Sequence, residues 1–350
     1  MTFEVGIHTF GDIVADPDTG ATPSPRQRVR ETIEQAVLAE QAGLDVFGIG
    51  EHHHHSFIAS SPPVLLSAIA ARTTRIRLTS AVTVLSTLDP VRVFEDYATL
   101  DLISDGRAEI IAGRGSTRES FPLFGWSLDD YAALFEEKLG LLLAARDGSP
   151  VSWVGRFRPA LEKAEIVPRP VQDVLPIYVG VGGTPASGAR AGRLGLPLAY
   201  GVLLGRVDDA VPVGEAYAAA AAEAGHDAST LRKMIAGHGF VARTSQAAHD
   251  TLYKYFTHGM NEFASSQGTA GSPMSRAAFA RQTSPHGALM SGSPQEVIDK
   301  LMLQHDLYGN DRVMIYMGLG GVPQREHLQA IELLGSDVAP VLRKELAVRA

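Results

Sequence analysis

Short apolar runs alternate with longer amphipathic segments along almost the whole chain of 350 residues. Apolar runs of strand length lie at residues 3–10, 44–50, 75–85, 108–115, 176–183, 196–204, 234–242 and 311–321. Between most of them, apolar side chains recur every three or four positions, which places them on one face of a helix. The pattern therefore predicts strands and helices in regular alternation.

Proline and glycine mark where the expected helices begin and end. Residues 26–43 finish on Gly43, a residue that favours the end of a helix. The segments 61–74 and 89–104 each carry proline in the first turn, where a helix tolerates it best. Two further helices are expected over 128–146 and 325–346.

The alternation predicts an α/β fold, a closed (β/α)8 barrel (TIM barrel), as a single domain over residues 1–350. Strands that alternate with helices pair in parallel through crossovers, and eight such units suffice to close a barrel. The competing fold is an open doubly wound sheet, in which the glycine-rich phosphate turn follows the first strand. Here that turn, residues 180–184, follows the fifth run instead, which favours the barrel.

Two segments are longer than ordinary barrel connections, and we expect them to be insertions. One covers about 116–176, with a hairpin expected around 151–170, and the other covers about 255–291. Long loops often form lids or binding loops. Their aromatic side chains fit either an apolar substrate or the packing of a lid: Phe121, Phe124, Trp126 and Phe263.

Composition excludes several classes of function. The chain has no cysteine, which removes disulfides, thiolate chemistry, iron–sulfur clusters and cysteine-ligated zinc. Its formal net charge of −8 argues against nucleic acid as a partner. No apolar run reaches the roughly 20 residues that span a bilayer, and the first residues do not resemble a signal peptide. We therefore expect a cytoplasmic protein without a membrane partner.

Two loops at the expected C-terminal ends of the strands, where barrel enzymes place their active sites, suit an anion. Gly182 and Gly183 can turn backbone N–H groups toward a ligand at the start of a helix marked by Thr184. Arg114 follows the fourth strand, and a guanidinium can bind phosphate through two hydrogen bonds. One phosphate would then lie between Arg114 and Thr184. The alternatives are an ordinary capped turn and a surface ion pair of Arg114 with Glu119.

Four consecutive histidines follow Glu51 directly after the second strand. Consecutive residues of an extended chain point to opposite sides, so His52 and His54 would share one side and Glu51 and His53 the other. A metal site needs about three protein ligands, and the positions after later strands offer His238 alone. From the residues themselves, a catalytic role, a metal site and a surface loop all remain open.

The chain resembles the bacterial luciferase-like, flavin-dependent monooxygenase family in three stretches: FGIGEHHHH, LTSAVTVLSTLDPVRVFEDYATLDLISDGRAEIIAGRGS and VGVGGTPASGARAGRLGLP. The similarity extends from the first strand to the final helix. This resemblance implies a (β/α)8 barrel, commonly dimeric, that binds FMN or the deazaflavin F420 at the C-terminal face of the strands. It also implies that Arg114 and Thr184 contact the phosphate, assisted by the backbone of Gly182 and Gly183.

The resemblance implies roles for the ends of the second and third strands as well. Ser80, Ala81 and Val82 match a cofactor-binding strand end, in which the Ala81–Val82 bond corresponds to a non-proline cis peptide beneath the isoalloxazine ring; a regular trans strand is the alternative.

His52 matches a histidine proposed to act on flavin–oxygen intermediates, and an imidazole suits this because it exchanges protons near neutral pH. His53 is expected as a second catalytic residue, and Glu51 as a cofactor contact. The sequence departs from luciferases in HHHHSF, where they carry an aromatic residue, and in lacking their reactive thiol. Both departures argue against light emission from an aldehyde.

We therefore expect a flavin-dependent monooxygenase or oxidoreductase that acts on a small organic substrate with FMN. No second nucleotide fingerprint is visible, so reduced flavin would come from a separate flavin reductase or from NAD(P)H. An F420-dependent hydride-transfer enzyme, a non-catalytic flavin-binding protein and a metal-dependent barrel hydrolase are the alternatives. The expected homodimer rests on the resemblance alone, and no metal or nucleic-acid partner is expected.

Overall fold

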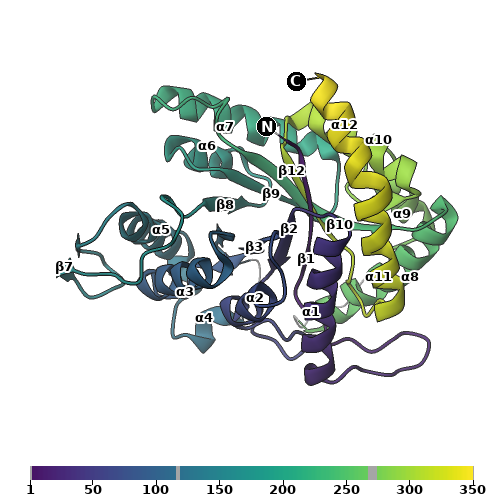
Figure 1. The fold of residues 1–350 in the computed structure, drawn as a ribbon, viewed down its shortest axis with the longest axis horizontal. Helices are drawn as coiled ribbons and strands as arrows, with labels where there is room; N and C mark the ends of the chain where they lie inside the picture. Colours follow the sequence, from purple (N-terminus) through teal and green to yellow (C-terminus); the bar gives the residue numbers. More distant parts are fainter. Residues whose placement is uncertain (1, 116–118, 267–273, 350) are drawn as a thin grey trace.

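The computed structural model describes residues 2–115, 119–266 and 274–349. Its central feature is a closed barrel of parallel strands (Figure 1). The strands are β1 Glu4–Thr9, β2 Val46–Ile49, β3 Arg77–Ser80, β5 Ala108–Gly113, β8 Ile177–Val181, β9 Leu198–Val202, β10 Lys233–Val241 and β12 Arg312–Tyr316. They pair in this order, and β12 pairs with β1 to close the ring. The predicted (β/α)8 barrel is confirmed.

Helices surround the barrel, and many of them begin with proline, as the sequence predicts (Figure 1). They are α1 Pro25–Gln41, α2 Pro62–Ala70, α3 Pro90–Ser104, α5 Tyr131–Asp147, α6 Pro185–Arg193, α7 Val211–Glu223, α8 Ser245–Ser266, α10 Pro294–Tyr308, α11 Gln324–Leu333 and α12 Ala339–Arg349. Among the helices described, none combines the length and the apolar character needed to cross a membrane.

The helix expected over 325–346 is interrupted. A π-helical turn, η3 Leu334–Val338, separates α11 from α12. Gly335 in this turn packs so closely on α1 that a Cβ at this position would lie 2.4 Å from the carbonyl oxygen of Ala42. A single π turn within an α-helix has no residue signature of its own, so the sequence pattern does not reveal it.

The run 75–85 also differs from its expectation, because it is not one strand. It forms β3 and the short β4 Thr83–Val84, and the two are separated at Ala81 and Val82. The hairpin expected around 151–170 is present as antiparallel β6 Val151–Trp153 and β7 Leu161–Ala164, which projects at the far left of Figure 1. The remaining short elements are α4 Ser120–Leu123, η1 Leu128–Asp130, η2 Val207–Ala210, α9 Arg276–Thr283 and β11 Met290–Gly292.

Charged side chains fill the N-terminal end of the barrel. The guanidinium of Arg312 is fully buried and donates to Glu109 at 2.6 Å and to Glu4 at 2.6 Å. Burial alone would raise the pKa of Glu109, but the ion pairs with Arg312 and Arg77 lower it to about 2. An apolar layer that includes Val46, Ile111, Tyr178, Ala199, Met234 and Met314 forms a second buried cluster inside the barrel. The N-terminal end of the barrel is therefore closed by these side chains.

Candidate active site

Glu51 connects the histidine loop to the short β4, which follows β3. One carboxylate oxygen, Oε2, accepts a hydrogen bond of 2.9 Å from the backbone N–H of Val84, and the other, Oε1, lies 2.8 Å from Nε2 of His53. The side chain is buried, so both contacts are shielded from water. Glu51 thereby fixes His53 and the short β4 in one arrangement.

The imidazole of His52 is held in place from three sides. Its ring stacks on Phe57 at 4.4 Å between centroids and meets the edge of Phe10 at 4.7 Å. Its Nδ1 lies 3.0 Å from Oε1 of Glu119, and the residue is only 8% exposed. A carboxylate at Nδ1 favours the tautomer with its proton there and leaves Nε2 as the nitrogen for a reacting molecule.

The later histidines are arranged differently. His53 meets the edge of Phe124 at 4.9 Å, while the rings of His54 and His55 lie 3.9 Å apart. Burial lowers the pKa of His54. Within the described parts of the chain, no group of three or more His, Cys, Asp or Glu side chains is placed to hold a metal ion. His238 lies on β10, and the geometry gives no support to a metal-dependent hydrolase.

The peptide bond between Ala81 and Val82 is cis, as the resemblance implies. The side chain of Val82 occupies the space beside two glycines: a Cβ on Gly113 would lie 2.4 Å from it, and one on Gly180 would lie 3.2 Å from it. Ser80 is fully buried, and its hydroxyl donates to the carbonyl of Ile111 and accepts from the N–H of the same residue. Its side chain therefore joins β3 to β5.

Arg114 and Thr184 come together at the start of α6, with Ser187 between them. Nη2 of Arg114 lies 3.4 Å from Oγ of Ser187, which lies 2.8 Å from Oγ1 of Thr184. The guanidinium also rests over the ring of Tyr131, 5.1 Å from its centroid. Strands β5 and β8 pair directly, as expected. A cation, two hydroxyls and a helix N-terminus together form a donor set suited to phosphate.

Ser187 was not singled out from the sequence, although a usable signal exists. It stands three residues after Thr184, the N-cap of α6, and this spacing brings the two side chains to the same end of the helix. From the sequence, Glu119 is expected only as a candidate partner of Arg114. In the structure it contacts His52, which no local pattern could predict because the two residues are 67 positions apart.

Exposed glycines lie beside this donor set. Gly182 is exposed, and a Cβ at this position would have no atom within 4 Å. On the neighbouring strand β9, Gly201 is also exposed, between Tyr200 and Val202, which are buried in the core. Gly183 has a φ of +103°, which side chains rarely adopt. Glycine backbone without side chains leaves room for a planar ring, so these residues fit a flavin or deazaflavin.

The aromatic residues of the insertions divide into two groups. Phe121 is fully buried against Tyr131, and Nε1 of Trp126 donates to the carbonyl of Thr87 at 3.0 Å, so both serve packing. Phe124 and Phe263 instead lie beside the histidines, the latter 6.4 Å from the ring of His52.

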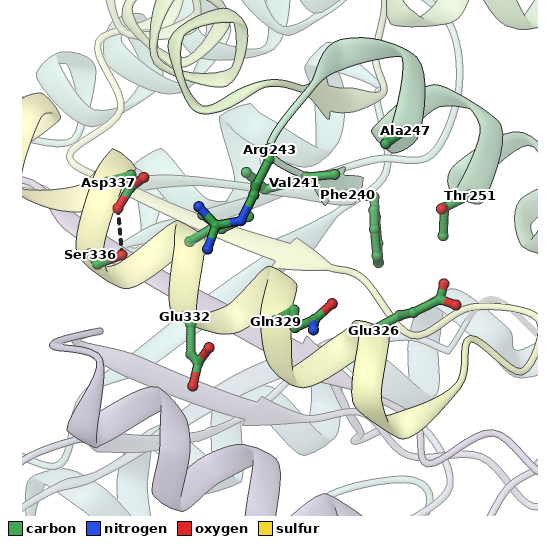
Figure 2. A pocket seen from close by; sticks show the side chains of 12 residues that line it. Phe240, Val241, Arg243, Ala247, Thr251, Glu326, Gln329, Glu332, Ser336 and Asp337 are labelled. Carbon is green, nitrogen blue, oxygen red and sulfur yellow. Dashed lines mark hydrogen bonds between the residues drawn. The ribbon is translucent and has the colours of Figure 1, made fainter.

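A cavity of about 520 Å³ lies away from these residues, between β10, α8 and α11. Figure 2 shows Glu326, Gln329 and Glu332 along α11, with Arg243 reaching across from the end of β10. None of the residues expected at the site lines this cavity. We assign no function to it.

Comparisons with known proteins agree with this architecture. Residues 3–311 match the luciferase-like monooxygenase family, and the chain belongs to this family. It is 26% identical to uncharacterised protein y4vJ of Sinorhizobium fredii, over 96% of this chain and 98% of that one. It is 24% identical to the alkanal monooxygenase alpha chain of Photorhabdus luminescens, over 88% of this chain and 90% of that one.

Solved structures with the same fold include monooxygenase RslO1 from Streptomyces bottropensis, with a TM-score of 0.84, 23% identity and coverage of 97% and 99% of the two chains. The oxygenating constituent of 3,6-diketocamphane monooxygenase from Pseudomonas putida, in complex with FMN, has a TM-score of 0.77, 20% identity and coverage of 97% and 99%. The coenzyme F420-dependent tetrahydromethanopterin reductase from Methanopyrus kandleri has a TM-score of 0.74, 20% identity and coverage of 98% and 100%.

Proposed function

We propose that this protein is a flavin-dependent monooxygenase or oxidoreductase that uses FMN on a small organic substrate. The observation that carries the proposal is the donor set formed by Arg114, Ser187 and Thr184 beside the exposed glycines. Membership of a family that contains an alkanal monooxygenase supports the oxygen-dependent reaction. The bound FMN of the diketocamphane enzyme supports this choice of cofactor.

The residues of the donor set would bind the cofactor phosphate. Arg114 supplies a guanidinium charge, and the hydroxyls of Ser187 and Thr184 supply further hydrogen bonds. Backbone at Gly182 and Gly183 would allow close approach to the cofactor, and Ala81 and Val82 would support its ring. When bound, FMN supplies the two-electron redox chemistry and the reaction with oxygen.

The histidine loop would handle protons. His52 is fixed by Glu119 through Nδ1, so its Nε2 can hold or release a proton beside the substrate. His53, fixed by Glu51, is proposed as its catalytic neighbour, and Glu51 as a residue that also borders the cofactor. Burial of this corner keeps water away from the reacting atoms.

The proposal extends to the setting of the enzyme. We infer one domain with insertions at about 116–176 and 255–291, a homodimer in the cytoplasm, and a separate flavin reductase or NAD(P)H as the source of electrons. Hydride transfer with F420 is the second candidate, because a reductase of the same fold depends on that coenzyme.

A titration of the purified protein with FMN and with F420 tests the choice. Gly182→Val adds a side chain at this exposed position, where a Cβ would have no atom within 4 Å, so it should lower FMN affinity at least tenfold without loss of stability. Gly148→Val is the matched control, because its Cβ also meets nothing within 4 Å but lies away from the site. Tight binding of F420 with none of FMN would favour hydride transfer. Binding of neither coenzyme would refute the proposal.

A further inference from the structure

The loop after β1 pairs with the end of the histidine loop. Asp12 forms an antiparallel bridge with Phe57. Backbone hydrogen bonds of 2.6 and 3.0 Å lie on either side of this bridge and join residues 11–13 to residues 56–58. The two segments therefore form a short two-stranded ribbon, which we call the loop ribbon.

Side chains hold the two segments of the loop ribbon at a fixed spacing. Gly11 has a φ of +67°, and a Cβ at this position would lie 2.2 Å from the side chain of Ile58. Glycine is the residue that allows both this conformation and this close approach. The ring of Phe10, just before the ribbon, also lies 6.1 Å from the ring of Phe57. The two segments therefore keep a fixed relation to each other.

Phe57 connects the loop ribbon to His52. Its ring is stacked on the imidazole, with 4.4 Å between the centroids and 19° between the planes. The backbone of His52 is tied to the same stretch of chain, because its N–H donates to the carbonyl of Ala59 at 3.0 Å. A shift of the ribbon would therefore remove a stacking contact from one face of the His52 ring.

A buried hydrogen bond ties the loop ribbon to the barrel. The hydroxyl of Tyr316, at the end of β12, donates to Oδ2 of Asp12. Strand β1 lies between β12 and β2, and β2 leads into the histidine loop. The bond therefore holds the ribbon from the strand on the far side of β1. Both residues are buried, so breaking the bond would leave an unpaired polar group away from water.

The charge on Asp12 strengthens this bond. Burial raises the pKa of its carboxyl to about 6, and the hydrogen bond from Tyr316, with the nearby charge of Arg28, opposes the rise. The carboxyl is therefore mostly ionised at pH 7. A hydrogen bond to an ionised acceptor is stronger than one between neutral groups, which suits this pair to fixing a loop.

We propose that Asp12 and Tyr316 are positioning residues for His52. Their hydrogen bond fixes the loop ribbon, and the ribbon holds Phe57 against the imidazole. The inference rests on the proposed function, since it adds to the residues that set the geometry of His52. Glu119 orients the imidazole through Nδ1, whereas the ribbon fixes the plane of the ring. In this assignment neither Asp12 nor Tyr316 is a catalytic residue.

The test records the NMR signal of the Cε1–H group of His52 in the purified protein without added FMN. His52→Gln identifies the signal. Stacking on an aromatic ring shifts such a signal upfield, so Phe57→Leu gives the position expected when the contact is lost. Asp12→Ala and Tyr316→Phe should each move the signal at least halfway toward that position. Asp12→Asn, which keeps an acceptor for the tyrosine hydroxyl, should keep it close to that of the parent protein.

A double variant separates positioning from stability. Tyr316→Phe and Asp12→Ala each leave one buried partner unpaired, so both should lower the melting temperature. The two changes combined remove both partners and should recover part of this loss, while the His52 signal stays displaced. A merely structural role would instead restore the signal together with the melting temperature, and this result would overturn the inference.

Tyr255→Phe is the matched control. The hydroxyl of Tyr255 donates to Oδ2 of Asp16 at 3.4 Å, so it ties the same loop to α8 instead of β12. This variant should leave the His52 signal unchanged. An unchanged signal in both single variants, an equal displacement in Tyr255→Phe, or an equal displacement of every histidine signal would also overturn the inference.

The affinity for FMN should stay within twofold in all these variants, because the phosphate contacts lie elsewhere. Failure of FMN to bind the parent protein would refute the proposed function separately, because the His52 signal is measured without the coenzyme.

Discussion

Nδ1 of His52 lies 3.0 Å from Oε1 of Glu119, although the two residues are 67 positions apart in the sequence. The contact joins the loop after β2 to the segment after β5 at the mouth of the barrel. A carboxylate that orients an imidazole in this way is a common device for setting which nitrogen carries the proton.

Replacing His52 by alanine should lower turnover by about 10²-fold or more, the lower end of the range for a general acid or base. FMN affinity should change little, because the phosphate contacts lie elsewhere. Steady-state kinetics together with an FMN titration measures both quantities. Glu119→Gln should lower kcat in the same direction with KM preserved. Equal losses of turnover and of FMN binding would mean that His52 is structural.

Arg114→Ala should weaken FMN binding by about 1.5–3 kcal/mol, the range for a charge-assisted hydrogen bond. Ser187→Ala should cost about 0.5–1.5 kcal/mol, because it removes a neutral hydrogen bond. Isothermal titration gives both values. Arg349→Ala, which removes a surface ion pair with Asp306, serves as the control. An unchanged affinity in Arg114→Ala would exclude this residue from the site.

Acid should destabilise the protein below about pH 6.5. Burial is the main cause that lowers the pKa of His8 and of His327 to about 3 and that of His238 to about 4. Between pH 6.5 and about 4, the unfolded chain binds protons that the native protein does not, so the free energy of unfolding falls as pH falls. Urea unfolding at pH 7, 6 and 5 measures this slope. His327→Leu should reduce the slope of the unfolding free energy against pH. A slope identical to that of the parent protein would contradict the role given to the buried His327.

Removing one partner of the buried ion pair at the bottom of the barrel should be costly. Glu109→Gln leaves Arg312 buried with less compensation, and we expect a loss of about 3–5 kcal/mol in the free energy of unfolding. Asp306→Asn, in an exposed pair with Arg349, should cost at most about 1 kcal/mol. Denaturant unfolding of the two variants measures both losses. Similar values would show that burial does not increase the contribution of an ion pair to stability.

The fold was predictable because its strands and helices carry local signals. Apolar runs identify the strands, proline marks the start of several helices, and the number of units indicates closure. The π turn at Gly335 was not predictable, since it depends on how closely this residue approaches Ala42 of a distant segment. The division of residues 75–85 into β3 and β4 also has no signal in the apolar pattern.

The candidate site was predictable in part. Arg114 and Thr184 follow strands that the barrel makes adjacent, so their approach follows from the fold. Ser187 completes the donor set, and its position three residues after Thr184 is a signal present in the sequence of α6. Asp12 and Tyr316 could not be joined from the sequence, because they are 304 positions apart and neither belongs to a recognisable motif.

The buried ion pairs of Arg312 with Glu4 and Glu109 have a kinetic consequence. These side chains close the lower end of the barrel in the described part of the chain. The proposed coenzyme and substrate would therefore both enter from the other end. A coenzyme that binds first would leave the entrance free for the substrate, whereas a substrate that binds first would block the entry of the coenzyme. Under the proposed function, a barrel that is open at one end favours binding of the coenzyme before the substrate and release of the product before the coenzyme.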